Sequence, residues 1–83
     1  METRYYHILS FVYDNKEIKR DFPNVIPQYM PGQSIAFSVE RIEKLGEIEE
    51  SAYIVDRVNH SYMQRWRDEH MAVHYVTLVI LKK

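Results

Sequence analysis

The triplet Arg65-Trp66-Arg67 has the residue types best suited to binding chemistry in this chain. An exposed tryptophan can stack on a nucleic-acid base, and a neighbouring guanidinium group can hold a phosphate. Tryptophan and arginine are also the residues most enriched at the hot spots of protein interfaces. The alternative is that Trp66 folds back and fills the mouth of a barrel, with both arginines in solvent. Asp68 and Glu69 follow directly and would repel a phosphate backbone, which favours a protein partner.

Seven tyrosines are too many for the core of so short a chain. We therefore expect an aromatic patch on one face of the domain, because such patches usually mark the surface that a partner covers. The tyrosines available for this patch are Tyr5, Tyr6, Tyr29, Tyr53 and Tyr62. The predicted binding site consists of Tyr62, Arg65, Trp66 and Arg67.

Other reactive side chains do not form a pattern typical of a metal site or an enzyme. His70 and His74 would be about 13 Å apart if they lie in a strand, which is too far to share one metal ion. The acidic cluster of Glu43, Glu47, Glu49 and Glu50 is typical of a solvated loop. The chain has no cysteine, only two glycines, and no serine in a Gly-x-Ser-x-Gly setting. We therefore expect no catalysis, no cofactor and no metal.

Length and composition predict one domain that spans residues 1–83. The chain is 46% hydrophobic and carries a formal net charge of -1, so no global field attracts nucleic acid or an anionic membrane. The first residues lack the pattern of a signal peptide. The longest apolar run, residues 76–81, is too short to span a bilayer. These features, with the absence of cysteine, predict a soluble cytoplasmic protein with no membrane contact.

The elements that must position the candidate site are two strand-like runs, residues 51–62 and 72–81. Both runs are rich in aromatic and β-branched residues, which fit a pleated surface better than a helix. The segment between them, residues 63–71, is polar except for Trp66 and two methionines. This pattern predicts a β-hairpin whose charged tip carries Trp66.

The first half of the chain predicts a second hairpin. Residues 4–13 are apolar on both faces, so this strand should be central, and Asp14-Asn15 should form the turn. Residues 16–22 form a charged edge strand in which Ile18 and Phe22 face inward. The next ten residues contain three prolines and should cross one end of a barrel and plug it, ending in a turn at Pro31-Gly32.

A third main strand is predicted for residues 34–42, with Ile35, Phe37 and Val39 inward. A helix over residues 39–45, capped by Gly46, competes with this interpretation. The fold class is thus all-β: an antiparallel five-stranded barrel or strongly bent sheet, with room for one short helical turn. The expected core is Leu9, Phe11, Ile35, Phe37, Val55, Val58, Val76 and Leu78.

The order of these elements resembles small SH3-like barrels, with the first hairpin, the proline connector ending in Pro31-Gly32, the strand from Ile35 to Val39 and the final hairpin. The spacing Tyr53-x-Val55-x-x-Val58 suits the bulged strand that such barrels require. Barrels of this kind are similar to accessory proteins of bacteriophages and other mobile elements. The function we expect is non-enzymatic binding of a protein partner, most economically by self-association into a homo-oligomer, which would also supplement a small core. The alternative is single-stranded nucleic-acid binding through Trp66 and the neighbouring arginines.

Overall fold

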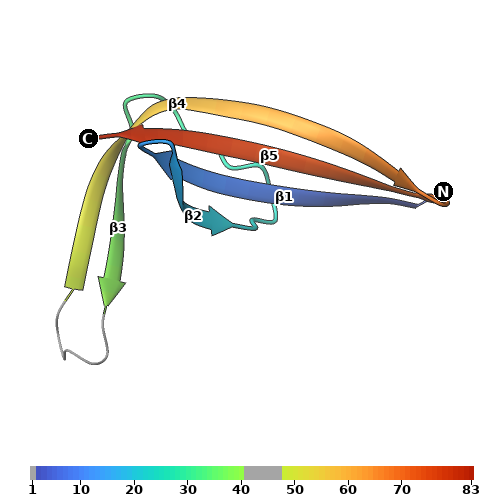
Figure 1. The fold of residues 1–83 in the computed structure, drawn as a ribbon, viewed down its shortest axis with the longest axis horizontal. Coiled ribbons are helices and arrows are strands. Elements are labelled where there is room, and N and C mark those ends of the chain that lie inside the picture. The colour runs from blue at the N-terminus through green and yellow to red at the C-terminus, as the bar shows by residue number, and fades with distance from the viewer. Residues whose placement is uncertain (1, 41–47) are drawn as a thin grey trace.

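The computed structural model describes residues 2–40 and 48–83, and these contain five strands and no helix. The strands form one sheet in the order β2-β1-β5-β4-β3 (Figure 1). Their bounds are β1 Glu2–Tyr13, β2 Lys16–Asp21, β3 Ser34–Glu40, β4 Ile48–Arg67 and β5 His70–Lys82. The all-β prediction with five strands is therefore confirmed.

The sheet is mixed and open, which corrects two parts of the prediction. β1 and β5 run parallel, while the other three neighbouring pairs are antiparallel. β2 and β3 remain as edges, so the sheet does not close into a barrel, and the bent-sheet alternative describes it. A parallel pair needs a long crossover connection, and here that connection is the whole chain between β1 and β5. The alternation of apolar and polar residues predicts that a segment is a strand, but not which strand it pairs with. The parallel pairing of β1 with β5 was therefore not predicted.

A β-bulge bends β4. The pairing between β4 and β5 shifts between Val55 and Arg57, so Asp56 is an extra residue in β4. The part of β4 that precedes the bulge turns away with β3 from the rest of the sheet (Figure 1). This confirms the bulged strand that the spacing of Tyr53, Val55 and Val58 predicted, and it divides the sheet into two parts.

The first hairpin forms as predicted. Asp14 and Asn15 have φ angles of 54° and 62°, which is the left-handed geometry that a two-residue hairpin turn requires. β1 is central and β2 lies at the edge. The inward placement of Ile18 and Phe22 is wrong, because their side chains are 41% and 71% exposed.

A register shift explains the exposure of Ile18. The pairing of β1 with β2 shifts between Phe11 and Val12, so that Lys19, rather than Ile18, lies opposite Phe11. The Lys19 Nζ atom then sits 5.7 Å from the centre of the Phe37 ring. A lysine stem can cover apolar surface while its charge stays in water, and Lys19 takes this role at the edge of the core.

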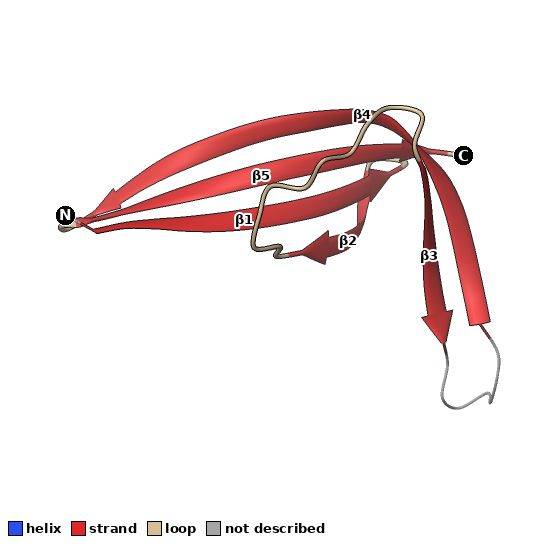
Figure 2. Cartoon of the chain, turned by 180° about the vertical axis from the view of Figure 1, so that it is seen from behind, coloured by secondary structure: helices blue, strands red, loops and turns tan. Residues whose placement is uncertain are grey.

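The proline-containing connector lies on one face of the sheet instead of plugging a barrel (Figure 2). Tyr29 packs edge-on against Phe11, with ring centres 5.6 Å apart. The predicted turn at Pro31-Gly32 is confirmed, since Gly32 has a φ of 88° and the Gln33 N–H donates to the Met30 carbonyl over 3.1 Å. The connector thus brings a second layer to the core face.

The core occupies the face that the connector covers. Its buried cluster is Leu9, Phe11, Val55, Val79 and Leu81, ringed by half-buried Tyr13, Tyr29, Ile35, Phe37, Tyr53 and Val58. The prediction is confirmed for Leu9, Phe11 and Val55, while Ile35, Phe37 and Val58 are only partly buried.

The predicted orientation of the last strand is wrong. Val76 and Leu78 are half-buried on the reverse face, and Val79 and Leu81 take the core positions. Both faces of β5 are apolar, so alternation could not choose between them. Val39 was also predicted inward and is 55% exposed.

The competing helix over residues 39–45 falls largely outside the described residues. Val39 and Glu40 lie in β3, and the rest of that range is not described. In the acidic cluster, Glu49 and Glu50 lie in β4 and are exposed. Glu43 and Glu47 are outside the described residues.

Candidate functional site

Trp66 lies within β4 and not at the tip of the hairpin. The predicted hairpin of β4 and β5 is confirmed, but the strands run closer to the tip than expected, with Trp66 opposite Met71 and Arg67 opposite His70. The turn has two residues, Asp68 and Glu69, and Asp68 has a φ of 56°. The polar composition of residues 63–71 suggested a longer loop. A half-exposed strand can have the same composition, so composition alone did not distinguish the two.

The predicted site is divided between the two faces of the sheet. Successive side chains of a strand point to opposite faces, so Tyr62 and Trp66 share one face and Arg65 and Arg67 share the other. Tyr62 is 65% exposed and Trp66 is 57% exposed. The alternative in which Trp66 fills a barrel mouth is therefore wrong. A base stacked on Trp66 would not meet the two arginines on the same face.

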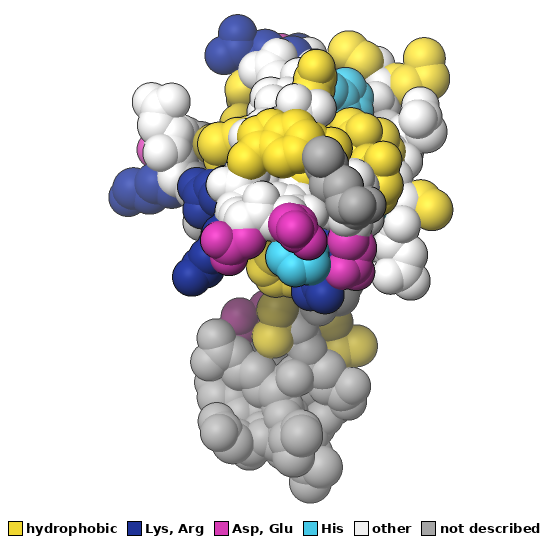
Figure 3. All heavy atoms as spheres, turned by 90° about the vertical axis from the view of Figure 1, so that its right-hand side faces the viewer, with side chains coloured by type: hydrophobic (Ala, Val, Ile, Leu, Met, Phe, Trp, Pro, Cys, Tyr) yellow, Lys and Arg dark blue, Asp and Glu magenta, His cyan; other side chains and the backbone are white. Residues whose placement is uncertain are grey.

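The face that carries Tyr62 and Trp66 presents a row of rings across three strands. Tyr75 of β5 lies in the middle, 5.4 Å from His7, 6.2 Å from Tyr5 and 6.0 Å from Tyr62, measured between ring centres. We call Tyr5, His7, Tyr62, Trp66 and Tyr75 the aromatic face. Figure 3 shows hydrophobic side chains gathered in a band at this end of the molecule.

The aromatic face continues the core face beyond the covered part of the sheet. Between them lies a groove of about 350 Å³, lined by Ile26 and Gln28 of the connector and by His60, Tyr62, Tyr75 and Thr77 of the sheet. The His60 Nδ1 and Thr77 Oγ1 atoms are 3.2 Å apart across β4 and β5. Sequence reasoning missed His7 and Tyr75, because only the strand register brings them beside Tyr5 and Tyr62.

The reverse face carries the two arginines. The register aligns Arg4, Ala72 and Arg65 in one row across β1, β5 and β4, and it aligns Glu2, His70 and Arg67 in the row beside it. The small Ala72 side chain leaves a depression of about 580 Å³ that these arginines line. On its other side, the rings of Tyr6 and His74 stack with centres 5.1 Å apart.

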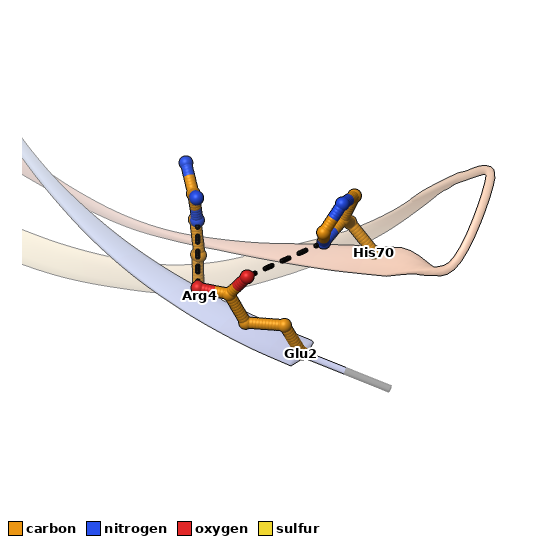
Figure 4. A network of polar contacts seen from close by, with 3 residues as sticks. All are labelled: Glu2, Arg4 and His70. Atoms are coloured by element: carbon orange, nitrogen blue, oxygen red, sulfur yellow. Dashed lines mark hydrogen bonds and ion pairs between the residues drawn. The ribbon is translucent and has the colours of Figure 1, made fainter.

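Glu2 organises one side of this depression. One carboxylate oxygen accepts a hydrogen bond from Arg4 Nε over 3.2 Å, and the other lies 3.5 Å from His70 Nδ1 (Figure 4). The hydrogen bond to Glu2 raises the pKa of the Arg4 guanidinium, with a further contribution from Tyr6. Arg65 and Arg67 make no ion pair with any residue that the structure describes. They are therefore the cations most available to a ligand on this face.

A second polar cluster, at the β1–β2 hairpin, is structural. The Ser10 hydroxyl is buried on the reverse face and donates to the Glu17 carboxylate over 2.6 Å. Arg20 donates to the same oxygen over 2.9 Å. The hydrogen bond from Arg20, and then that from Ser10, lowers the pKa of the Glu17 carboxyl. This cluster gives the buried Ser10 hydroxyl a hydrogen-bond acceptor and holds the edge strand β2 against β1.

The histidines do not assemble a metal site in the described part of the chain. His70 contacts Glu2 and His74 stacks on Tyr6. Within residues 2–40 and 48–83, no three histidine or carboxylate side chains converge as metal ligands would. The same residues contain no helix long and apolar enough to cross a membrane.

The chain was also compared with known proteins. No protein family, no curated protein and no solved structure matches it. Its function is therefore inferred from the residues and geometry of the two faces.

Proposed function

We propose that this chain is a non-enzymatic binding module that acts through protein–protein contacts, with self-association as its simplest form. The observation that carries the proposal is the aromatic face. Tyr5, Tyr62 and Trp66 are each more than half exposed, and they lie on the same side of the sheet as the core. An exposed apolar patch of this kind marks the surface that a partner covers.

The layer structure supports the same proposal. A sheet is stable when its apolar face is covered by a second layer. The connector and the bent part of β4 with β3 cover the core around Phe11. Beyond that region, the described residues provide no layer over Tyr5, Tyr62 and Trp66. A partner would provide it, and aromatic rings of this size each bury about 150–250 Å² when covered.

Light scattering over a concentration series tests the proposal. We expect the wild-type mass to rise above the 10.1 kDa of one chain. Tyr62→Ser should weaken this association by about 1–2 kcal/mol, because it removes an exposed ring from the aromatic face. Tyr6→Ser is the matched control, since Tyr6 is an exposed tyrosine that points to the reverse face. Equal weakening by the two variants would contradict the assignment of the aromatic face.

Single-stranded nucleic-acid binding is the second candidate, and the reverse face is the observation that favours it. Arg4 and Arg65 flank the small Ala72, and the Tyr6–His74 stack lies beside them. Guanidinium groups next to stacked rings can hold phosphates and bases together. Glu2 and Asp68 lie in or beside the same depression and oppose a polyanion. We therefore rank this candidate below protein binding.

An oligonucleotide titration separates the two candidates. If the reverse face binds single strands, Arg65→Gln should lower the affinity several-fold and flatten its dependence on salt. Arg57→Gln is the control, because Arg57 lies in the same strand outside the depression. If protein binding is the function, both variants should match the wild type, with only weak oligonucleotide binding. A part in the assembly of a bacteriophage or other mobile element stays a prediction from the resemblance.

A further inference from the structure

Within the described residues, the outer edge of β4 has no neighbouring strand over its second half. β3 pairs only with residues 48–54 of β4, and the last backbone hydrogen bonds on this side join Val55 to Gly32 and Gln33, each over 2.8 Å. Beyond Arg57, the described residues place no strand beside the outer edge of β4 (Figure 1). The unpaired edge that follows Arg57 is a template for pairing with another chain.

The opposite edge of the same region differs. It belongs to β1, and Phe22, Pro23 and Asn24 lie close to Tyr5, Tyr6 and His7 there. The described part of the chain therefore approaches the β1 edge and leaves the β4 edge open. The open edge also carries Tyr62 and Trp66, so pairing there would extend the aromatic face.

We infer that residues 59–67 of β4 pair antiparallel with the same residues of a second copy of this chain, about a two-fold axis at Met63. The inference rests on the proposed function, since it names the partner and the contact for self-association. The two sheets would join into one continuous sheet through main-chain hydrogen bonds, as in other cases of strand addition.

Charge decides the register. A two-fold axis perpendicular to the sheet places side chains of the same face opposite each other. An axis at Tyr62 would use the whole edge but would set Arg57 opposite Arg67, and like charges in opposing positions are destabilising. An axis at Met63 sets Arg57 opposite Glu69 and Arg67 opposite Asn59. This register contains no opposing like charges.

The same register brings the exposed tryptophan into the contact. On the aromatic face, it sets Trp66 of one copy opposite His60 of the second, and Tyr62 opposite Gln64. Aromatic cross-strand pairs of this kind stabilise neighbouring strands. On the reverse face, Ser61 comes opposite Arg65, and Met63 meets its own copy at the axis. Trp66, half exposed in the single chain, therefore becomes part of the contact.

Cysteine crosslinking tests the register directly, because the chain has no cysteine. Opposing residues of an antiparallel pair have Cα atoms about 4.5–5.5 Å apart, within the range of about 4.4–6.8 Å that a disulfide spans. Met63→Cys should therefore form a disulfide-linked dimer under mild oxidation. Ser61→Cys is the matched control on the same face, because its copy would be about 14 Å away along the strand.

The expected result is a dimer band on a non-reducing gel for Met63→Cys and at least tenfold less for Ser61→Cys. Both side chains are exposed, so circular dichroism should show an unchanged fold. Stronger crosslinking at Ser61 or Tyr62 would overturn the register. If the wild type associates but no cysteine at positions 61–64 crosslinks, the edge is not the contact, while the proposed function stands. A wild type that stays monomeric would overturn the inferred edge contact and also self-association as the form of the proposed function.

Discussion

Phe11→Ala should lower the free energy of unfolding by about 3–5 kcal/mol, enough to unfold much of a domain with a small stability margin. Phe11 is 3% exposed and lies at the centre of the core face. Its ring meets those of Phe37 and Tyr29 edge-on, at 5.1 Å and 5.6 Å between centres. Truncation therefore removes two aromatic contacts and leaves a cavity that the sheet cannot close.

Urea denaturation followed by circular dichroism measures this change. Val12→Ala is the control, because Val12 is the next residue of the same strand and is half-buried on the reverse face. It should lower the free energy of unfolding by less than half as much. Equal losses from the two variants would mean that the connector and the bent end of β4 do not form the principal core.

The sequence predicted those elements that local patterns determine. Alternation placed the strands, and turn chemistry placed Asp14-Asn15 and Pro31-Gly32, because only a few residue types tolerate a positive φ. The spacing around Val55 predicted the bulge. These features depend on residues close together in the chain, where backbone preferences act directly.

Long-range features could not be predicted in the same way. The parallel pairing of β1 with β5 depends on contacts between the two ends of the chain, and no local pattern encodes a neighbour. β5 is apolar on both faces, so its pattern allowed either Leu78 or Val79 in the core. The bulge and the register together select Val79. A shift of one residue exchanges the two faces of a strand.

The candidate site shows the same difference between features set by local patterns and features set by long-range pairing. Trp66 and Tyr62 were predicted to be binding residues by type, and both lie on the aromatic face. The grouping of Trp66 with Arg65 and Arg67 failed because the segment was predicted to be a loop. Once it is a strand, alternation separates the tryptophan from the arginines. Tyr75 was missed, since its central place follows only from the order of β1, β5 and β4.

Trp66→Ala should leave the melting temperature nearly unchanged and weaken self-association by about 2 kcal/mol or more, which is about 30-fold in Kd. The indole ring is 57% exposed in the single chain, so little core packing is lost with it. In the inferred dimer, the same ring lies opposite His60 of the second copy. Its energetic contribution should therefore appear in binding and not in folding.

Phe22→Ala is the appropriate control for this variant, because Phe22 is an aromatic residue with 71% exposure that lies away from the β4 edge. Thermal melting and sedimentation of both variants, at matched concentrations, separate stability from association. A melting temperature lowered by the equivalent of about 3–5 kcal/mol would mean that Trp66 fills a core cavity. Phe22 lies beside Tyr5 and His7 near the β1 edge, so equal weakening of association by Phe22→Ala would mean that the β4 edge is not the contact. Loss of association with Trp66→Ala alone would tie the binding surface to the end of β4.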